Sequence, residues 1–314
     1  MDITNLNYYV RSSFMSKKLP PVSVIIPVYN DSDRLKSCLQ SLQKQTYPKT
    51  LYEVIVVDNG SDENIEMIVS QFNQALATYE SRPGSYVARN KGISIAKGDV
   101  IAFTDADCIP AQDWIERGVA NLLRVPECGL VGGKIELFFK IPGQPTAVEL
   151  HQSVEAFDQK RYVEELGFGA TANLFTFRSV IDNVGSFDET LKSSGDQEWG
   201  QRVLLAGYKQ VYSDETCVAH PARHSLSQLY KKIVRVTGGH YDLKKKKEYP
   251  LKSFLGELAR DLLPFSDIVY RIWLDKRLEG KKQKVQVTFI TLMSSYVRAW
   301  EKVRLQLGGR ATRV

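Results

Sequence analysis

Short apolar runs alternate with amphipathic stretches along the first half of the chain. The runs are bounded by turn-forming residues, as expected for buried strands. Between them, apolar residues recur at helical spacing, as in Leu35, Leu39 and Leu42. The predicted strands are 22–28, 53–57, about 77–80 and 100–103, and the predicted helices lie near 32–46, 61–72, 84–96 and 111–123. Strand alternating with helix four times predicts an α/β fold with a doubly wound, mostly parallel sheet.

The second half of the chain is less regular. Its pattern predicts a strand at 129–135, a helix near 147–165, a strand after the loop 168–173, a helix at 198–206 and short strand pieces at 211–212 and 218–220. Beyond residue 226 the pattern changes to amphipathic helices, which are expected at 253–263, 268–278 and 285–307. The chain is therefore expected to end in a helical extension.

Polar residues follow three of the predicted strands. Asn30 follows the first strand, Asp58 the second, and Asp105 and Asp107 the strand that ends at Phe103. Because parallel strands gather their carboxyl ends along one edge, these side chains should line one cleft. Two carboxylates at alternating positions can hold a hard divalent cation through oxygen ligands. The alternative is that they only shape the turn before the next helix.

Composition adds limits on location and class. The 314 residues suit one large domain, or a domain with an appendage, and the 43% hydrophobic content is typical of a soluble globular protein. Four scattered cysteines suit a reducing compartment and argue against a disulfide framework or a cysteine zinc site. Residues 1–20 are a polar leader without the apolar core of a signal peptide, and no apolar run reaches the length of about 18 that a membrane span needs. The expected location is the cytoplasm.

Charge is distributed unevenly along the chain. Residues 1–230 hold 22 basic and 28 acidic residues, whereas residues 231–314 hold 20 basic and 8 acidic ones. A basic tail on an acidic body predicts contact with an anionic surface, and a helix at 285–307 flanked by basic residues suits a membrane interface, so the protein is expected to lie peripherally on the inner face of the membrane. No RNA- or DNA-binding motif is present, so nucleic acid is not an expected partner. The alternatives are a solvated extension, or a helix packed on the catalytic domain or a second subunit.

Four segments carry a family resemblance. They read SVIIPVYN at 23–30, DNGSD at 58–62, ARNKG at 88–92 and DAD at 105–107, and their order and spacing resemble those of family 2 glycosyltransferases. The resemblance implies the GT-A fold and transfer of a sugar, with inversion, from a nucleotide donor that usually carries uracil. It covers about residues 20–240. It implies a catalytic domain at 21–240, with a donor half 21–135 and an acceptor half 136–240, followed by a basic helical extension at 241–314.

The resemblance also assigns roles to individual residues. For the donor nucleotide it implies Pro27, Tyr29, Asn30, Asp58, Arg89 and Asp105. Asp107 and His220 are the implied ligands of a Mg²⁺ or Mn²⁺ ion that bridges the pyrophosphate.

The implied catalytic base is Asp196. The family usually places an acid directly before it, where this chain has Gly195, and a simple helix N-cap is the alternative role for Asp196. Candidates on the acceptor side are Gly133, Asn173, Glu198 and Trp199. Trp199 is expected either to stack on an acceptor sugar or to anchor the core. Arg223, Lys231, Lys232 and Arg235 either approach the donor phosphates or face solvent.

These features predict a single-sugar transferase. The chain lacks the Gln-x-x-Arg-Trp motif of processive synthases of the family, and the acceptor is expected to be a glycan or lipid-linked hydroxyl in cell-surface polysaccharide or glycolipid assembly. One alternative is a catalytically silent scaffold that binds a nucleotide sugar or a membrane surface. A nucleotidyltransferase is disfavoured because the segment after the first strand, 27–33, is acidic and lacks a glycine-rich phosphate loop.

Overall fold

The computed structural model describes residues 19–246, 248–263 and 267–312, so nearly all of the predicted leader lies outside the described residues. Its centre is one eight-stranded sheet in the order β3-β2-β1-β4-β7-β6-β8-β5. The strands are β1 (Val22–Val28), β2 (Tyr52–Asp58), β3 (Ala75–Tyr79), β4 (Val100–Thr104), β5 (Ile109–Pro110), β6 (Cys128–Phe138), β7 (Asn173–Phe177) and β8 (Lys209–Pro221).

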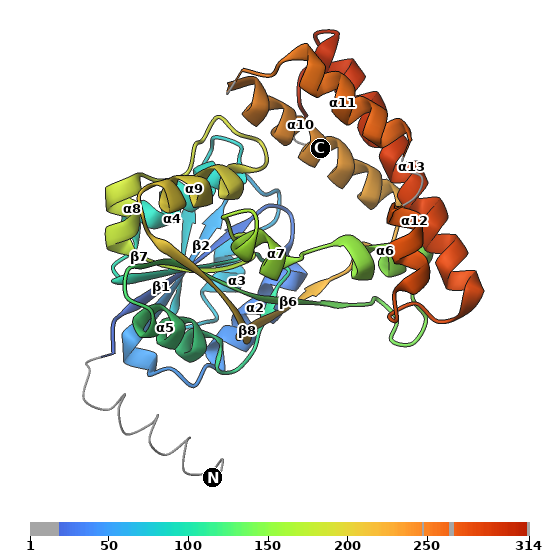
Figure 1. Cartoon of the computed structure of the whole chain (residues 1–314). Helices are drawn as coiled ribbons and strands as arrows, with labels where there is room; N and C mark the ends of the chain where they lie inside the picture. Colours follow the sequence, from blue (N-terminus) through green and yellow to red (C-terminus); the bar gives the residue numbers. More distant parts are fainter. Residues whose placement is uncertain (1–18, 247, 264–266, 313–314) are drawn as a thin grey trace, which may run out of the picture.

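The first four strands are parallel, and helices cover both faces of the sheet (Figure 1). The helices of the first half are α2 (Ser32–Gln43), α3 (Ile65–Val69), α4 (Ser85–Ile95) and α5 (Trp114–Arg124), with a 3₁₀ turn η1 (Lys49–Leu51). Side chains alternate along β1: Val24 and Ile26 enter the core under α2 and α5, whereas Ile25 enters the core under α4. The predicted α/β fold with a doubly wound sheet is confirmed.

The second half adds antiparallel pairing. β7 lies between β4 and β6 and is antiparallel to both, whereas β6 and β8 are parallel over a long register with irregularities. The two strand pieces predicted near 211 and 218 are parts of the one strand β8. Its irregular pairing opposite Gly133 and Lys134 interrupts the alternation that would have revealed its length.

The helix predicted at 147–165 is two helices, α6 (Ala147–Glu155) and α7 (Gln159–Glu164). The break follows from Phe157, whose φ of +53° is left-handed, and from Asp158, whose side chain caps α7 by accepting from the Arg161 N–H.

After α8 (Arg178–Val184), helix α9 (Gly195–Leu205) begins three residues earlier than predicted. Asp196 therefore lies inside its first turn.

The chain ends in a helical layer beside the sheet (Figure 1). It consists of α10 (Leu226–Lys246), α11 (Leu251–Leu262), α12 (Asp267–Leu274) and α13 (Gly280–Gln306). α13 packs along α10, α11 and α6, and small apolar clusters join Val148 of α6 to Ile233 and Ile290. The boundary proposed at residue 240 falls inside the continuous helix α10. Within the described ranges, no helix is long and apolar enough to cross a membrane.

Candidate active site

The loops after β1 and β2 are joined by hydrogen bonds. The Asn30 side chain donates to an Asp62 carboxylate oxygen (3.2 Å) and accepts from the Asp62 N–H (2.8 Å), while Asp58 accepts from the Ser61 N–H (2.9 Å). Asn30 adopts a φ of +49°, a conformation that asparagine tolerates well. Tyr29 beside it is 57% exposed. Asn30 thus holds the two loops together, and Tyr29 projects from their rim.

Arg89 connects α4 to the end of β4. Its guanidinium is almost fully buried and donates to Asp105 Oδ1 at 2.5 Å, while its Nε has no partner among the described residues. A buried cation without a partner carries a large desolvation cost, so the pair orders both side chains. The structure therefore brings together two of the residues predicted to bind the nucleotide.

Asn59 positions the segment that begins α4. Its buried side chain donates to the carbonyls of Glu80 and Arg82 and accepts from the Gly84 N–H, at 2.8 to 2.9 Å. This polar bridge sets where Tyr86 and Arg89 project.

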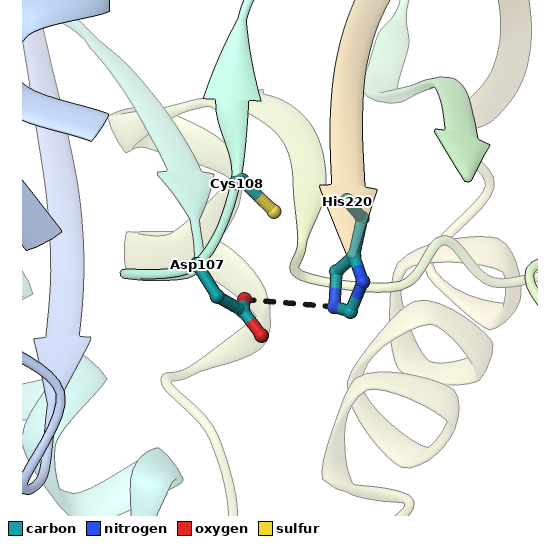
Figure 2. A group of neighbouring side chains, drawn as sticks. All are labelled: Asp107, Cys108 and His220. Carbon is teal, nitrogen blue, oxygen red and sulfur yellow. Dashed lines mark ion pairs between the residues drawn. The ribbon is translucent and has the colours of Figure 1, made fainter. Parts of the chain in front are cut away.

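Asp107 and His220 lie side by side (Figure 2). Asp107 Oδ1 is 3.5 Å from His220 Nε2, although 113 residues separate them in the sequence. Cys108 Sγ belongs to the same group, in which all ligand atoms lie within 4.8 Å of one another. Burial raises the pKa of the Cys108 thiol, which keeps it protonated, and Mg²⁺ and Mn²⁺ prefer oxygen and nitrogen ligands. Asp107 and His220 are therefore the better ligand pair.

The hydrogen bonding of His220 fits this role. Its Nδ1 lies 2.8 Å from the Pro221 carbonyl oxygen, which can only accept, so Nδ1 carries the proton. Nε2 is then the ring nitrogen that faces Asp107. This is the arrangement by which proteins orient metal-binding imidazoles.

Two residues that we did not single out from the sequence contact Asp107 and His220. Arg34 Nη1 lies 3.5 Å from Asp107 and its Nε is 2.6 Å from Asp31, and the Phe157 ring lies 4.7 Å from the His220 ring. The sequence around Arg34 and around Phe157 contains no motif that would have predicted these contacts. Only the fold brings α2 and the α6–α7 break to this edge.

Asp196 is placed by contacts from α4 and α9. Its Oδ1 accepts from the Tyr86 hydroxyl (3.3 Å) and from the Gln197 N–H (3.0 Å), and the Arg89 guanidinium lies 5.8 Å from the Tyr86 ring centroid. Burial raises the pKa of the Asp196 carboxyl above its usual range, and the Arg89 charge and these two hydrogen bonds limit the rise. Contacts through Arg89 and Tyr86 thus connect Asp105, the predicted ribose-binding residue, to Asp196, the predicted base.

Gly195 replaces the acid that the family usually carries, and its packing explains the change. A Cβ at this position would lie 2.7 Å from Cε2 of the Tyr86 ring, closer than real Cβ contacts allow. A side chain at position 195 would therefore force the Tyr86 ring, which contacts Asp196, to shift.

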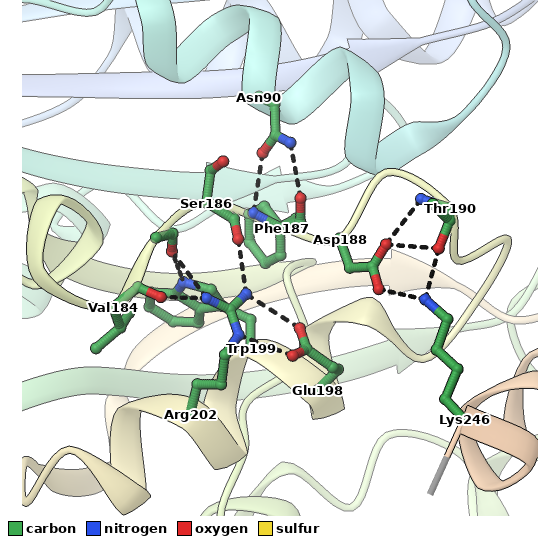
Figure 3. A network of polar contacts seen from close by, with 11 residues as sticks. Asn90, Val184, Ser186, Phe187, Asp188, Thr190, Glu198, Trp199, Arg202 and Lys246 are labelled. Carbon is green, nitrogen blue, oxygen red and sulfur yellow. Dashed lines mark hydrogen bonds and ion pairs between the residues drawn. The ribbon is translucent and has the colours of Figure 1, made fainter.

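Glu198 and Trp199 have packing roles (Figure 3). Trp199 is 0% exposed and donates its indole N–H to the Gly185 carbonyl (2.9 Å), so it is a core residue with no surface for an acceptor sugar. Glu198 binds Arg202 through both carboxylate oxygens, and Arg202 donates to backbone carbonyls of the 184–186 turn. The pair anchors the turn that precedes α9.

The other two acceptor-side candidates are also occupied by internal contacts. The Asn173 side chain is fully buried, accepts from the Trp114 indole N–H and donates to the carbonyls of Lys134 and Thr216. A Cβ at Gly133 would overlap the Thr216 carbonyl oxygen, so close packing against β8 accounts for this glycine. None of the four candidates presents a free group to an acceptor.

The Tyr86 hydroxyl should set the pH dependence of Asp196. Tyr86→Phe removes a hydrogen bond that stabilises the ionised carboxylate, so the already raised pKa of Asp196 should rise further. Since a base must be ionised, the acid limb of the kcat/KM profile should move to higher pH. Tyr208→Phe is the matched control, because Tyr208 follows the C-terminal end of α9 and its hydroxyl accepts from the Asn183 side chain. An unmoved acid limb in Tyr86→Phe would contradict this role.

The segment that carries Asp58, Arg89, Asp105 and Asp107 matches a known family. Residues 23–186 match the family described as "Glycosyl transferase family 2".

The chain belongs to glycosyltransferase family 2.

It is a glycosyltransferase, and several proteins of this activity are similar to it in sequence. Glycosyltransferase AglE of Haloferax volcanii is 40% identical over 230 residues, which cover 72% of this chain and 74% of that protein. The poly(ribitol-phosphate) beta-glucosyltransferase of Bacillus spizizenii is 38% identical over 196 residues, 60% of this chain and 30% of that protein. This glycosyltransferase thus spans most of the first relative and less than a third of the second.

Solved structures share its fold. A mannosyltransferase of Pyrobaculum calidifontis, PcManGT, in complex with GDP-Man and Mn²⁺, aligns with a TM-score of 0.61 at 16% identity and covers 94% of both chains. This similarity shows the GT-A fold alone. Because the coverage extends to nearly the whole chain, the fold similarity includes much of the C-terminal helical layer.

Proposed function

We propose that this glycosyltransferase moves one sugar from a nucleotide-sugar donor to an acceptor hydroxyl, with inversion, using Asp196 as general base and a divalent cation held by Asp107 and His220. The observation that carries the proposal is the arrangement of two acidic centres. Asp107 Oδ1 lies 3.5 Å from His220 Nε2, and Asp196 stands in the first turn of α9, linked to Asp105 through Tyr86 and Arg89.

The donor end offers groups for each part of a nucleotide sugar. In the proposal, the base lies against Pro27, Tyr29 and Asp58, and the ribose lies at Asp105, which Arg89 holds in place. A bound Mg²⁺ or Mn²⁺ would supply Lewis-acid stabilisation of the departing diphosphate. We propose a uridine nucleotide, and because PcManGT was solved with GDP-Man, guanosine nucleotides are the necessary comparison.

Asp196 would accept the proton of the attacking hydroxyl. Burial raises the pKa of its carboxyl, which strengthens the carboxylate as a base, while the Arg89 charge and two hydrogen bonds oppose the rise. Inversion follows if the hydroxyl attacks the anomeric carbon from the side opposite the diphosphate, in a single displacement.

The acceptor is proposed to be a glycan or lipid-linked hydroxyl in cell-surface polysaccharide or glycolipid assembly. Two related proteins support this class, since one is a poly(ribitol-phosphate) beta-glucosyltransferase and another, 22% identical over 227 residues, is a glycosyltransferase whose name specifies a dolichyl sugar phosphate acceptor.

A donor panel tests the reaction. Uridine and guanosine diphosphate sugars should be hydrolysed slowly or transferred only when Mg²⁺ or Mn²⁺ is added, and one base should be strongly preferred. Indifference to every nucleotide sugar, with or without metal, would instead favour a silent scaffold.

The C-terminal helices are proposed to rest on an anionic phospholipid surface at the inner face of the membrane. Each of α11, α12 and α13 exposes an apolar stripe at helical spacing, formed by Leu251, Leu255 and Leu262, by Tyr270, Trp273 and Leu274, and by Val285, Phe289, Tyr296 and Trp300. Exposed basic residues accompany the stripes, namely Lys252, Arg260, Lys276, Lys281 and Lys282. Apolar and aromatic side chains beside lysines are the composition that binds anionic bilayers.

Vesicle sedimentation tests this surface. The double substitution Phe289→Ser and Trp300→Ser should weaken binding to phosphatidylglycerol-containing vesicles at least about tenfold, because each aromatic ring contributes roughly 1.5–3 kcal/mol when buried. Both side chains are about two-thirds exposed, so the fold should survive. Met67→Ser, at an equally exposed site on α3, is the control. Unchanged sedimentation of the double variant would contradict the proposal.

A further inference from the structure

Three basic side chains gather where β8 leads into α10. Arg223 lies in the segment between Pro221 and Leu226, and Lys232 and Arg235 lie one turn apart on α10, where residues three apart share a face. Within the described part of the chain, none of the three forms an ion pair with a carboxylate. The cluster thus has three basic side chains and no carboxylate in direct contact with any of them.

The cluster adjoins the proposed metal site. Lys232 Nζ lies 5.5 Å from the centroid of the Phe157 ring, and that ring lies 4.7 Å from the ring of His220. Arg223 is held from the other side, since its Nη1 donates to Gln152 Oε1 on α6 at 3.3 Å. Phe157 reaches this place because its left-handed backbone breaks the chain between α6 and α7. The three cations therefore lie on the α10 side of His220.

The electrostatic environment of these three side chains favours binding of an anion. Burial, with repulsion from Arg223 and Arg235, lowers the pKa of Lys232 to about 7, and burial with repulsion from Arg235 lowers the pKa of Arg223 to about 10. Glu155 acts in the opposite direction on Lys232, and Asp107 and Asp105 do so on Arg223, but neither effect restores the usual pKa. Crowded, partly buried like charges cost folding free energy, and proteins retain them where a ligand supplies the opposite charge.

The donor does not account for all of this charge. Its diphosphate would face the divalent cation, while Arg34 is already paired with Asp31 and Asp107, and Arg89 with Asp105. A nucleotide-sugar diphosphate carries two negative charges, which one divalent cation balances, so the three further basic side chains are available to a second anion. Each guanidinium can bind a phosphate through two parallel hydrogen bonds, and the lysine adds a point charge.

We propose that Arg223, Lys232 and Arg235 form a subsite for a phosphate group on the acceptor. The inference rests on the proposed function, because it needs an acceptor that approaches from the side of α10. α10 also carries Leu229 and Ile233, which pack against Ile290 of α13, so the subsite lies on the helix that connects the catalytic site to the C-terminal layer. The acceptor class is therefore a phosphate ester, and a neutral glycan would leave the three cations unmatched.

Binding measurements with simple probes test the subsite without turnover. Octyl phosphate and inorganic phosphate represent an esterified and a free phosphate, octanol is the uncharged analogue, and UDP and GDP with Mn²⁺ represent the donor side. Lys232→Met and Arg235→Gln should each weaken octyl phosphate binding at least about tenfold, the usual size of one charge-assisted contact. Lys231→Met, at the exposed neighbouring position, should change it by less than about threefold.

These probes distinguish an esterified phosphate from a free one, and they distinguish the acceptor subsite from the proposed donor site. Weaker binding of both phosphates in the two variants, with nucleotide binding unchanged, supports the subsite, and tighter binding of octyl phosphate than of inorganic phosphate identifies an ester as the ligand. Loss of UDP and GDP binding with octyl phosphate unaffected would assign the cluster to the donor and overturn the inference, as would equal binding of octanol. Asp196→Asn should leave octyl phosphate binding intact, so a failure of the reaction chemistry would be recognised separately.

Discussion

Asp107→Ala should lower sugar transfer by at least about 10³-fold, because it removes the carboxylate that faces His220 Nε2 and with it several kcal/mol of charge stabilisation at the diphosphate. The same change should weaken Mn²⁺ binding and the metal-dependent part of donor binding. Transfer is measured as sugar incorporation at saturating donor, and Mn²⁺ binding by calorimetry or electron paramagnetic resonance.

The control for this change is Asp182→Ala, which removes an exposed carboxylate from α8, away from the residues of the proposed site. It should leave both metal binding and transfer near the wild-type values. If Asp107→Ala bound Mn²⁺ as tightly as the wild type, the ion would lie elsewhere, even if transfer were reduced.

Asp196→Asn should lower the rate constant of transfer by about 10²–10⁴-fold, the usual contribution of a positioned general base. The amide is close in shape to the carboxylate and still accepts a hydrogen bond from Tyr86, so the fold and the donor affinity should be preserved. A drop in kcat with an unchanged dissociation constant for the nucleotide would distinguish this residue from Asp107. Because its folded pKa is raised, the wild-type rate should increase with pH as Asp196 ionises, and the variant should lose that acid limb.

Glu198→Gln is the matched control on the same helical turn. It weakens the bidentate contact with Arg202 and should therefore lower thermal stability, while the acid limb of the pH profile stays in place. If Glu198→Gln abolished the acid limb and Asp196→Asn did not, the assignment of the base would pass to Glu198.

Several elements were predictable from the sequence because their signals are local. The strand predicted at 22–28 has those bounds in the structure, and the apolar run at 100–103 is β4 with one further residue. Alternating burial along a strand and the i, i+3, i+4 repeat of a helix are written into neighbouring residues, so they need no distant partner. The same holds for the polar residues that end β1, β2 and β4, whose convergence follows from parallel strand order.

Other features depend on contacts between distant segments. The local sequence around Trp199 is compatible both with a tryptophan that stacks on a sugar and with one that packs in the core. The packing of α9 buries Trp199 completely, at 0% exposure. Gly195 departs from the family pattern because Tyr86, more than a hundred residues earlier, occupies the space that a Cβ would need. The break at Phe157 likewise depends on a left-handed backbone angle that no periodicity reveals.

The sequence by itself thus determined the α/β order, the family and the residues at the ends of the parallel strands. The family resemblance implied that Asp107 and His220 share one site, and the structure places them 3.5 Å apart. Tertiary structure alone decided that Phe157 packs on His220 and that Arg223, Lys232 and Arg235 gather on the α10 side of it. The physical reason is the sequence distance over which each interaction acts. Periodicity and turn preference act over a few residues, whereas charge pairing, burial and close packing depend on which distant segments the sheet and helices bring together.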